Sequence, residues 1–120
     1  MVNKNEIMNT QNEPLPVVMP AVDFRAEVLN SQQPVLVEFW TPWSRPCQIL
    51  DAVLQELARE LAGIGKVVRV NADDSIDLSL AYDIQSVPTL IYFVAGRPRW
   101  NIVGTASKEA ILGKLQLFSK

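Results

Sequence analysis

The stretch FWTPWSRPC, residues 39–47, ends in Cys47, the single cysteine of this 120-residue chain. A hydrophobic strand pattern precedes these residues and a helical pattern follows them, so we expect a turn from a strand into a helix. A residue at the start of a helix faces free backbone N–H groups and the positive end of the helix dipole, and a cysteine there is a reactive thiolate. Ser44 occupies this position. We expect its hydroxyl to cap the helix by accepting a hydrogen bond from the N–H of Cys47.

The composition excludes several other kinds of chemistry. Eleven Lys and Arg residues are balanced by thirteen Asp and Glu residues, and the net charge of -2 gives no basic surface for nucleic acid or for an anionic membrane. The chain has no histidine, which removes catalysis by Ser-His-Asp and Cys-His groups, and one cysteine does not make a zinc site. We therefore expect neither a metal nor a cofactor.

The cysteine count also bears on location, because one cysteine cannot form a disulfide within the chain. This favours a reducing compartment, and we expect the cytoplasm. The first residues, MVNKNEIMNTQNEPLP, are polar and do not resemble a secretory signal. We expect residues 1–15 to be a flexible N-terminal tail and residues 16–120 to form one domain.

Strand-like and helix-like segments alternate along this domain. The last two strands are joined by the short turn AGRP and must be antiparallel, so the sheet is mixed. The order predicts an α/β fold in which a central mixed sheet of about five strands carries about four helices on its two faces. Strands are predicted at residues 16–19, 34–40, 66–71, 89–94 and 99–103, and helices at residues 21–30, 44–62, 75–82 and 107–118.

Four segments, VEFWTPWSRPC, SVPT, VAGRP and IVGTAS, resemble the thioredoxin family and occur in that family's order. The resemblance spans roughly residues 17–119 and implies the thioredoxin fold, with a cis peptide bond between Val87 and Pro88. The family's redox motif is Cys-x-x-Cys at a helix start. Here it reads Ser44-Arg45-Pro46-Cys47, so the attacking thiol is missing.

Glu38 interrupts the hydrophobic segment PVLVEFW, where an unpaired buried carboxylate would be costly. The resemblance implies that Glu38 is the family's buried acid, which handles the proton of the second cysteine, and that Arg69 is its basic partner. We expect a Glu38–Arg69 interaction, and a raised pKa of Glu38 if the pair is loose. The alternative is a Glu38 at a strand end that faces solvent.

The resemblance further implies an apolar face that binds protein or extended-peptide partners. The backbone of Val87 would pair with an extended peptide, and Arg45 adds a positive charge that favours acidic partners. The alternative is that Pro88 is an ordinary strand-edge proline without a binding role. The residues matched to this docking face are Trp43, Arg45, Pro46, Val87, Pro88, Val103 and Gly104.

Three functions remain open because Ser44 cannot start disulfide exchange as a thiolate does. The first is a protein that docks partners without dithiol turnover. The alternative is a thiol–disulfide oxidoreductase, in which Ser44 is an engineered replacement of cysteine or Cys47 acts as a monothiol; that alternative implies a partner of the thioredoxin-reductase type. The third is a purely structural subunit. Cys47 itself is either reactive or a small buried hydrophobe.

Overall fold

A computed structural model of the protein describes residues 17–18 and 23–118, and the predicted N-terminal tail lies outside these residues. The described strands form one mixed sheet in the order β2-β4-β3-β5-β6. Neighbouring strands β2, β4 and β3 are parallel, whereas β5 runs antiparallel to β3 and β6 antiparallel to β5. Their bounds are β2 Val17–Val18, β3 Val35–Trp40, β4 Lys66–Asn71, β5 Thr89–Val94 and β6 Arg97–Val103.

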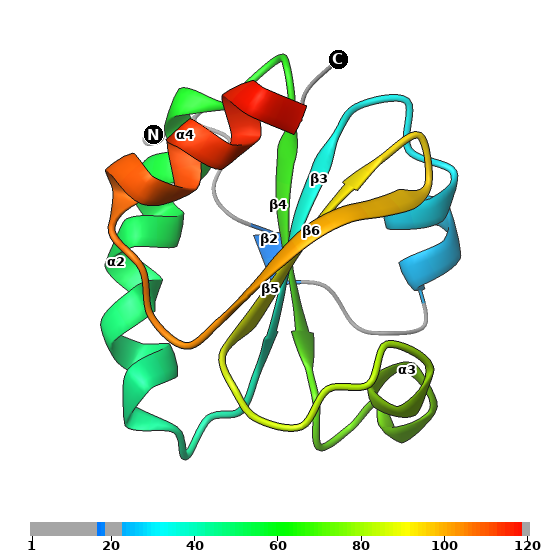
Figure 1. The fold of residues 1–120 in the computed structure, drawn as a ribbon. Coiled ribbons are helices and arrows are strands. Elements are labelled where there is room, and N and C mark those ends of the chain that lie inside the picture. Colours follow the sequence, from blue (N-terminus) through cyan, green and yellow to red (C-terminus); the bar gives the residue numbers. More distant parts are fainter. Residues whose placement is uncertain (1–16, 19–22, 119–120) are drawn as a thin grey trace, which may run out of the picture.

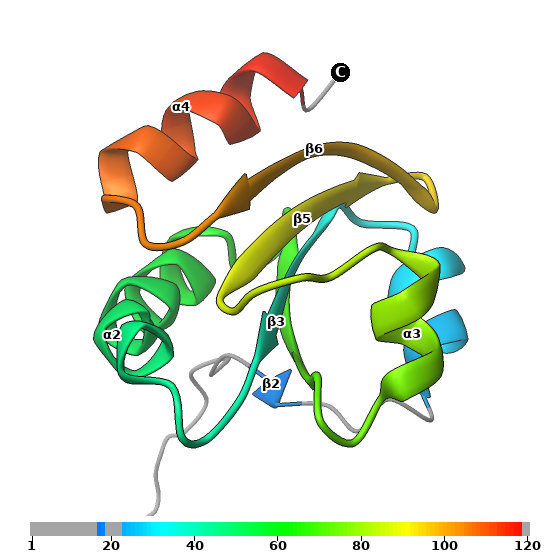
Figure 2. The same cartoon turned by 60° about the horizontal axis from the view of Figure 1, so that its bottom comes forward.

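Helices cover both faces of this sheet, as predicted. Figures 1 and 2 show α2 and α4 on one face and α3 on the other, beside the blue helical segment η2. The described helical segments are η2 Arg25–Leu29, α2 Arg45–Glu60, α3 Ile76–Ala81 and α4 Lys108–Phe118. The α/β prediction and the mixed sheet of about five strands are therefore confirmed.

Strand β3 is hydrophobic apart from Glu38 because it is buried on both faces. Its odd-numbered residues Val35, Val37 and Phe39 pack in the core layer under η2 and α3, whereas Leu36 packs in the layer under α2 and α4. Because side chains alternate along a strand, Glu38 projects to the same face as Leu36. The carboxylate is thereby placed on the side of the sheet that α2 covers.

The hairpin between β5 and β6 is tighter than the sequence predicts. Ala95 and Gly96 have φ of 54° and 78°, and two consecutive positive values are characteristic of a two-residue hairpin turn. As a result β6 begins at Arg97, and Pro98 lies inside the strand rather than in the turn. A proline is tolerated there because β6 is at the edge of the sheet.

The hairpin turn generates a prediction about Gly96. A Cβ at this position would lie 2.5 Å from the carbonyl oxygen of Leu29, in addition to the strain of a positive φ. We expect Gly96→Ala to lower the free energy of unfolding by about 2 kcal/mol or more, measured by urea denaturation. Gly63→Ala is the matched control, because Gly63 also has a positive φ, 86°, but a Cβ there meets nothing within 4 Å. Equal losses for the two variants would contradict the proposed clash.

Candidate functional site

The start of α2 is capped by Ser44, as the sequence predicts. Ser44 has an extended backbone, and its hydroxyl accepts a hydrogen bond from the N–H of Cys47 at 3.3 Å. Its carbonyl accepts a second bond from the N–H of Gln48 at 3.2 Å. The side chain is almost fully buried, with 4% of Ser44 exposed. The hydroxyl therefore has a structural role, whatever chemistry the position carries in other proteins.

Glu38 and Arg69 pair as predicted. The two residues are direct neighbours in the register of β3 and β4, and Nε of Arg69 donates to Oε1 of Glu38 at 2.8 Å. Glu38 is completely buried, so the alternative of a solvent-facing carboxylate is wrong. Two other groups hold the guanidinium: Nη1 lies 3.3 Å from Oδ1 of Asp51, and Cζ lies 4.2 Å from the ring centre of Trp40.

Burial raises the pKa of Glu38 from 4.5 to about 7. The hydrogen bond and the charge of Arg69 act in the opposite direction, while the charge of Asp51 raises the pKa slightly further. The sequence predicts a raised pKa if the pair is loose. The pair is close, at 2.8 Å, and the pKa is raised nonetheless. Desolvation outweighs a close ion pair here, because the carboxylate has no contact with solvent.

The second oxygen of Glu38, Oε2, is buried and has no hydrogen-bond partner among the described residues. A protonated carboxyl has one O–H to donate, and an unpaired oxygen is the natural place to hold that proton. With a pKa of about 7, the group takes up and releases protons near neutral pH. The geometry is therefore that of a buried acid or base rather than of a permanently ionised salt bridge.

A small hollow of about 180 Å³ lies between Arg69 and the start of α2, and Glu38 is not among the residues that line it. Cys47 is 1% exposed, yet it contributes to the wall of the hollow, as does Arg69. The volume is sufficient for several water molecules. Arg69 thus links the two groups, because it binds Glu38 and lines the same space as Cys47. The lining residues are Trp40, Thr41, Pro42, Cys47, Gln48, Asp51 and Arg69.

The docking face lies at the end of the sheet where β3 leads into α2, the lower end in Figure 1. Trp43 and Val103 are 70% and 63% exposed, and Arg45 and Pro46 are exposed as well. The backbone N–H of Gly104 donates to the carbonyl of Pro88 at 2.8 Å, which brings these two predicted residues together.

The loop before β5 completes this face. The Val87–Pro88 peptide bond is cis. Pro88 is buried, whereas Val87 is half-buried, so Val87 presents more surface to a partner. No hydrogen bond within the described residues involves the backbone of Val87. The binding roles of these residues stay predictions.

Two residues of the site were missed from the sequence. Oδ2 of Asp73 accepts a hydrogen bond from Nε1 of Trp43 at 2.8 Å, and Asp51 contacts Arg69. Asp51 could have been found, because it follows Cys47 by four residues and so lies on the same side of α2. Asp73 lies in the loop between β4 and α3, and no periodicity indicates its partner.

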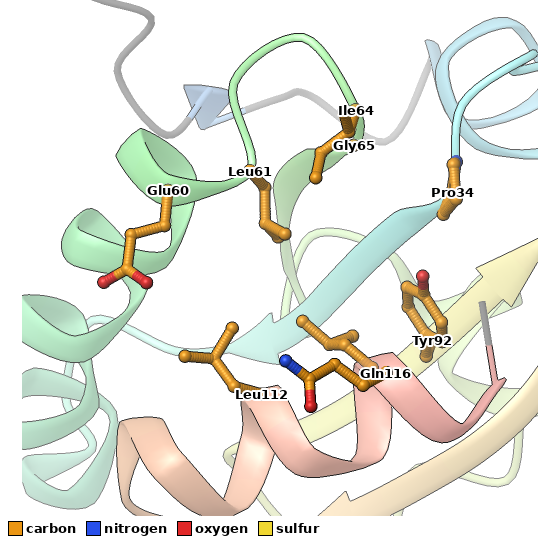
Figure 3. A pocket seen from close by; sticks show the side chains of 9 residues that line it. Pro34, Glu60, Leu61, Ile64, Gly65, Tyr92, Leu112 and Gln116 are labelled. Atoms are coloured by element: carbon orange, nitrogen blue, oxygen red, sulfur yellow. The ribbon is translucent and has the colours of Figure 1, made fainter.

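A larger hollow of about 430 Å³ lies at the other end of β3 and contains none of the predicted site residues. Figure 3 shows it between the end of α2 and α4, with Leu61 and Leu112 on its walls and Pro34 and Ile64 at its margin. Its one charged lining residue, Glu60, is already in an ion pair with Lys108. Size alone therefore does not identify the functional site.

The mixed sheet, the capped start of α2, the buried acid and the loop before β5 together define a protein with the thioredoxin fold. A sequence model of the thioredoxin family matches residues 16–116. The chain belongs to the thioredoxin family.

Relatives of several origins support this assignment. The chain is 40% identical to a thioredoxin of Griffithsia pacifica over 93 residues, covering 78% of this chain and 85% of that protein. It is also 40% identical over 93 residues to thioredoxin 1 of Nostoc, covering 78% and 87% of the two chains. The chloroplastic thioredoxin M5 of rice is 39% identical over 95 residues, which are 79% of this chain and 55% of that protein.

The expected cytoplasmic location is contradicted by these relatives. They include the chloroplastic thioredoxins M5 of rice and M4 of Arabidopsis thaliana. The expectation was wrong because a single cysteine argues only against a disulfide within the chain. It does not distinguish one reducing compartment from another.

The pKa of Glu38 generates a prediction about stability. Because the pKa is about 7 in the folded protein and 4.5 without the fold, the folded state binds more protons between these values. The free energy of unfolding should therefore fall as the pH rises from about 4.5 to 7, by on the order of 3 kcal/mol, and level off above that range. Urea denaturation across this pH range measures the slope.

Glu38→Gln should remove this contribution while keeping the shape of the side chain. Glu109→Gln, an exposed position on α4, is the control and should retain it. If the dependence on pH survives in Glu38→Gln, another group is responsible.

Proposed function

We propose that this protein takes part in thiol–disulfide exchange with protein partners, and that Cys47 is the thiol that reacts. The observation that carries the proposal is the fully buried Glu38 with a pKa of about 7. A buried ionisable group is costly to stability, and a protein that only docks its partners has no use for a proton acceptor. The thioredoxins among its relatives support an exchange activity.

The proposed step begins with transfer of the Cys47 thiol proton to Glu38, with Arg69 beside the path. The Cys47 sulfur then attacks one sulfur of the partner's disulfide, and the partner's S–S bond breaks. The released partner sulfur takes up a proton, and Cys47 remains in a mixed disulfide with the partner. A second thiol, from glutathione or from a cysteine of the partner, then attacks the partner's sulfur in the mixed disulfide. A new disulfide forms between that thiol and the partner, and Cys47 leaves and takes up the proton that the attacking thiol has lost.

The docking face would present the partner to Cys47. Trp43 and Val103 offer apolar surface, and the backbone of Val87 is suited to pair with an extended segment of the partner. Arg45 is exposed beside them and favours a segment that carries a carboxylate. If an enzyme rather than glutathione regenerates Cys47, this function would also require a partner of the thioredoxin-reductase type.

A second candidate is docking without exchange, and a different observation favours it. Cys47 is 1% exposed, and the hydroxyl of Ser44 is engaged in capping α2. In this case Cys47 is a small core residue, and only the apolar face acts. The two candidates differ in whether the folded protein forms a mixed disulfide.

The reactivity of Cys47 separates the candidates. Incubation of the folded chain with a disulfide-containing peptide should give one mixed disulfide, detected by mass spectrometry of the intact protein. The rate should rise as the pH passes through about 7, because Glu38 must be ionised to accept the proton. Cys47→Ser should give no adduct, and Glu38→Gln should slow the reaction about tenfold or more and flatten its pH profile. Absence of an adduct with the folded chain would favour docking alone.

Ser44→Cys tests whether the remaining machinery is intact. The new thiol would lie at the start of α2, where the helix dipole and the free N–H groups stabilise a thiolate. We expect reduction of insulin disulfides with dithiothreitol to increase at least about tenfold over the parent chain, and the increase to require Cys47. The double variant Ser44→Cys/Cys47→Ser is the control. No gain in activity would mean that more than one sulfur atom separates this protein from an active reductase.

A further inference from the structure

Helix α3 has a solvent-exposed apolar ridge that the site described above does not use. Ile76 and Leu80 are 60% and 75% exposed. They are four residues apart, so they lie next to each other on one side of the helix. Asp77 belongs to the same helix and Asp83 follows its end, and both are exposed. These four residues are called the α3 ridge below.

The surroundings of the α3 ridge are acidic. Residues 70–96 contain no lysine or arginine, and the four aspartates Asp73, Asp74, Asp77 and Asp83 are all exposed. Within the described part of the chain, no ion pair neutralises any of these four carboxylates. An apolar surface bordered by unneutralised charges of one sign favours a partner with the opposite sign.

The ridge also adjoins the docking face. Nε1 of Trp43 donates to Asp73, which precedes Ile76 by three residues. The N–H of Asp73 in turn donates to the side-chain oxygen of Asn71 at 2.9 Å, which fixes the loop. The exposed ring of Trp43 is therefore held against the segment that leads into α3. A partner that covers Trp43 is well placed to reach Ile76 and Leu80.

From these observations we propose that the α3 ridge binds a basic amphipathic helix of a protein partner. The apolar side of that helix packs on Ile76 and Leu80, and its lysine or arginine side chains pair with Asp77 and Asp83. Helix-on-helix packing suits an exposed i, i+4 ridge. The inference rests on the proposed function only in that the partner is a protein that also contacts Trp43. On the α3 side of Trp43 the partner is therefore expected to be positively charged. Beside Arg45 it is expected to be negatively charged.

The experiment measures binding of a synthetic peptide by fluorescence anisotropy. The probe is a fluorescein-labelled amphipathic peptide of leucine and lysine without cysteine, and the matched probe replaces each lysine with glutamate. We expect saturable binding of the lysine peptide and at least tenfold weaker binding of the glutamate peptide. Binding of the lysine peptide should weaken as the salt concentration rises, because the charged contacts are exposed.

Variants locate the binding surface. Ile76→Ser/Leu80→Ser should weaken binding of the lysine peptide at least fivefold, and Asp77→Asn/Asp83→Asn should weaken it and reduce its salt dependence. Asparagine is tolerated at position 83, where φ is 55°. The control is Leu117→Ser, because Leu117 is 76% exposed and belongs to α4, which lies on the opposite face of the sheet from α3. It should leave binding unchanged.

Several results would overturn the proposal: no saturable binding, equal binding of both peptides, or an equal loss in Leu117→Ser. A dimer detected by sedimentation and abolished by Ile76→Ser/Leu80→Ser would also overturn it, since the occupant would then be a second copy of this chain. The assay uses no thiol chemistry. Its failure would leave exchange by Cys47 untouched, and failure of exchange would leave the peptide result standing.

Discussion

The burial of Glu38 beside Arg69 is the constraint on which the arrangement of the site depends. A carboxylate in the middle of a doubly covered strand requires a partner on the neighbouring strand, and the parallel register of β3 and β4 supplies Arg69 opposite it. Arg69 is held in turn by Asp51 of α2 and by the ring of Trp40. One buried charge thus links two strands and a helix.

This pair is a poor device for stability alone, because apolar residues of similar volume commonly stabilise a core as well or better. Burial keeps the pKa of Glu38 near neutrality although a cation is in contact with it, and Oε2 has no competing hydrogen bond within the described residues. The protein therefore has a buried group that titrates near neutral pH, and the partner of that group, Arg69, lines the same hollow as Cys47.

Much of the fold could be predicted from the sequence because its signals are local. The alternation of strands and helices follows from hydrophobic periodicity, and the cap by Ser44 follows from its residue type and position. The Glu38–Arg69 contact followed from the family resemblance together with the cost of burying a charge. Other features depend on packing that no local pattern encodes. Pro98 was read as part of the turn, because an edge strand that accepts a proline is recognised only when the strand order is known.

The loops of the site were the least predictable part. The bond between Trp43 and Asp73 joins residues thirty positions apart in two exposed segments, and neither residue type requires the other. The pKa of Glu38 also depended on three-dimensional burial, which the sequence could not weigh against the attraction of Arg69. The prediction of a cytoplasmic location was wrong for a different reason. The number of cysteines constrains redox chemistry, but it does not specify a cellular compartment.

The proline within β6 has a consequence for how this molecule meets other chains. A strand that tried to extend the sheet alongside β6 would find no amide hydrogen at Pro98 and would meet the positive charges of Arg97 and Arg99. Sheet growth in that direction is therefore discouraged. This edge therefore works against lengthening of the sheet by any second chain, whether that chain is a partner or another copy of this protein.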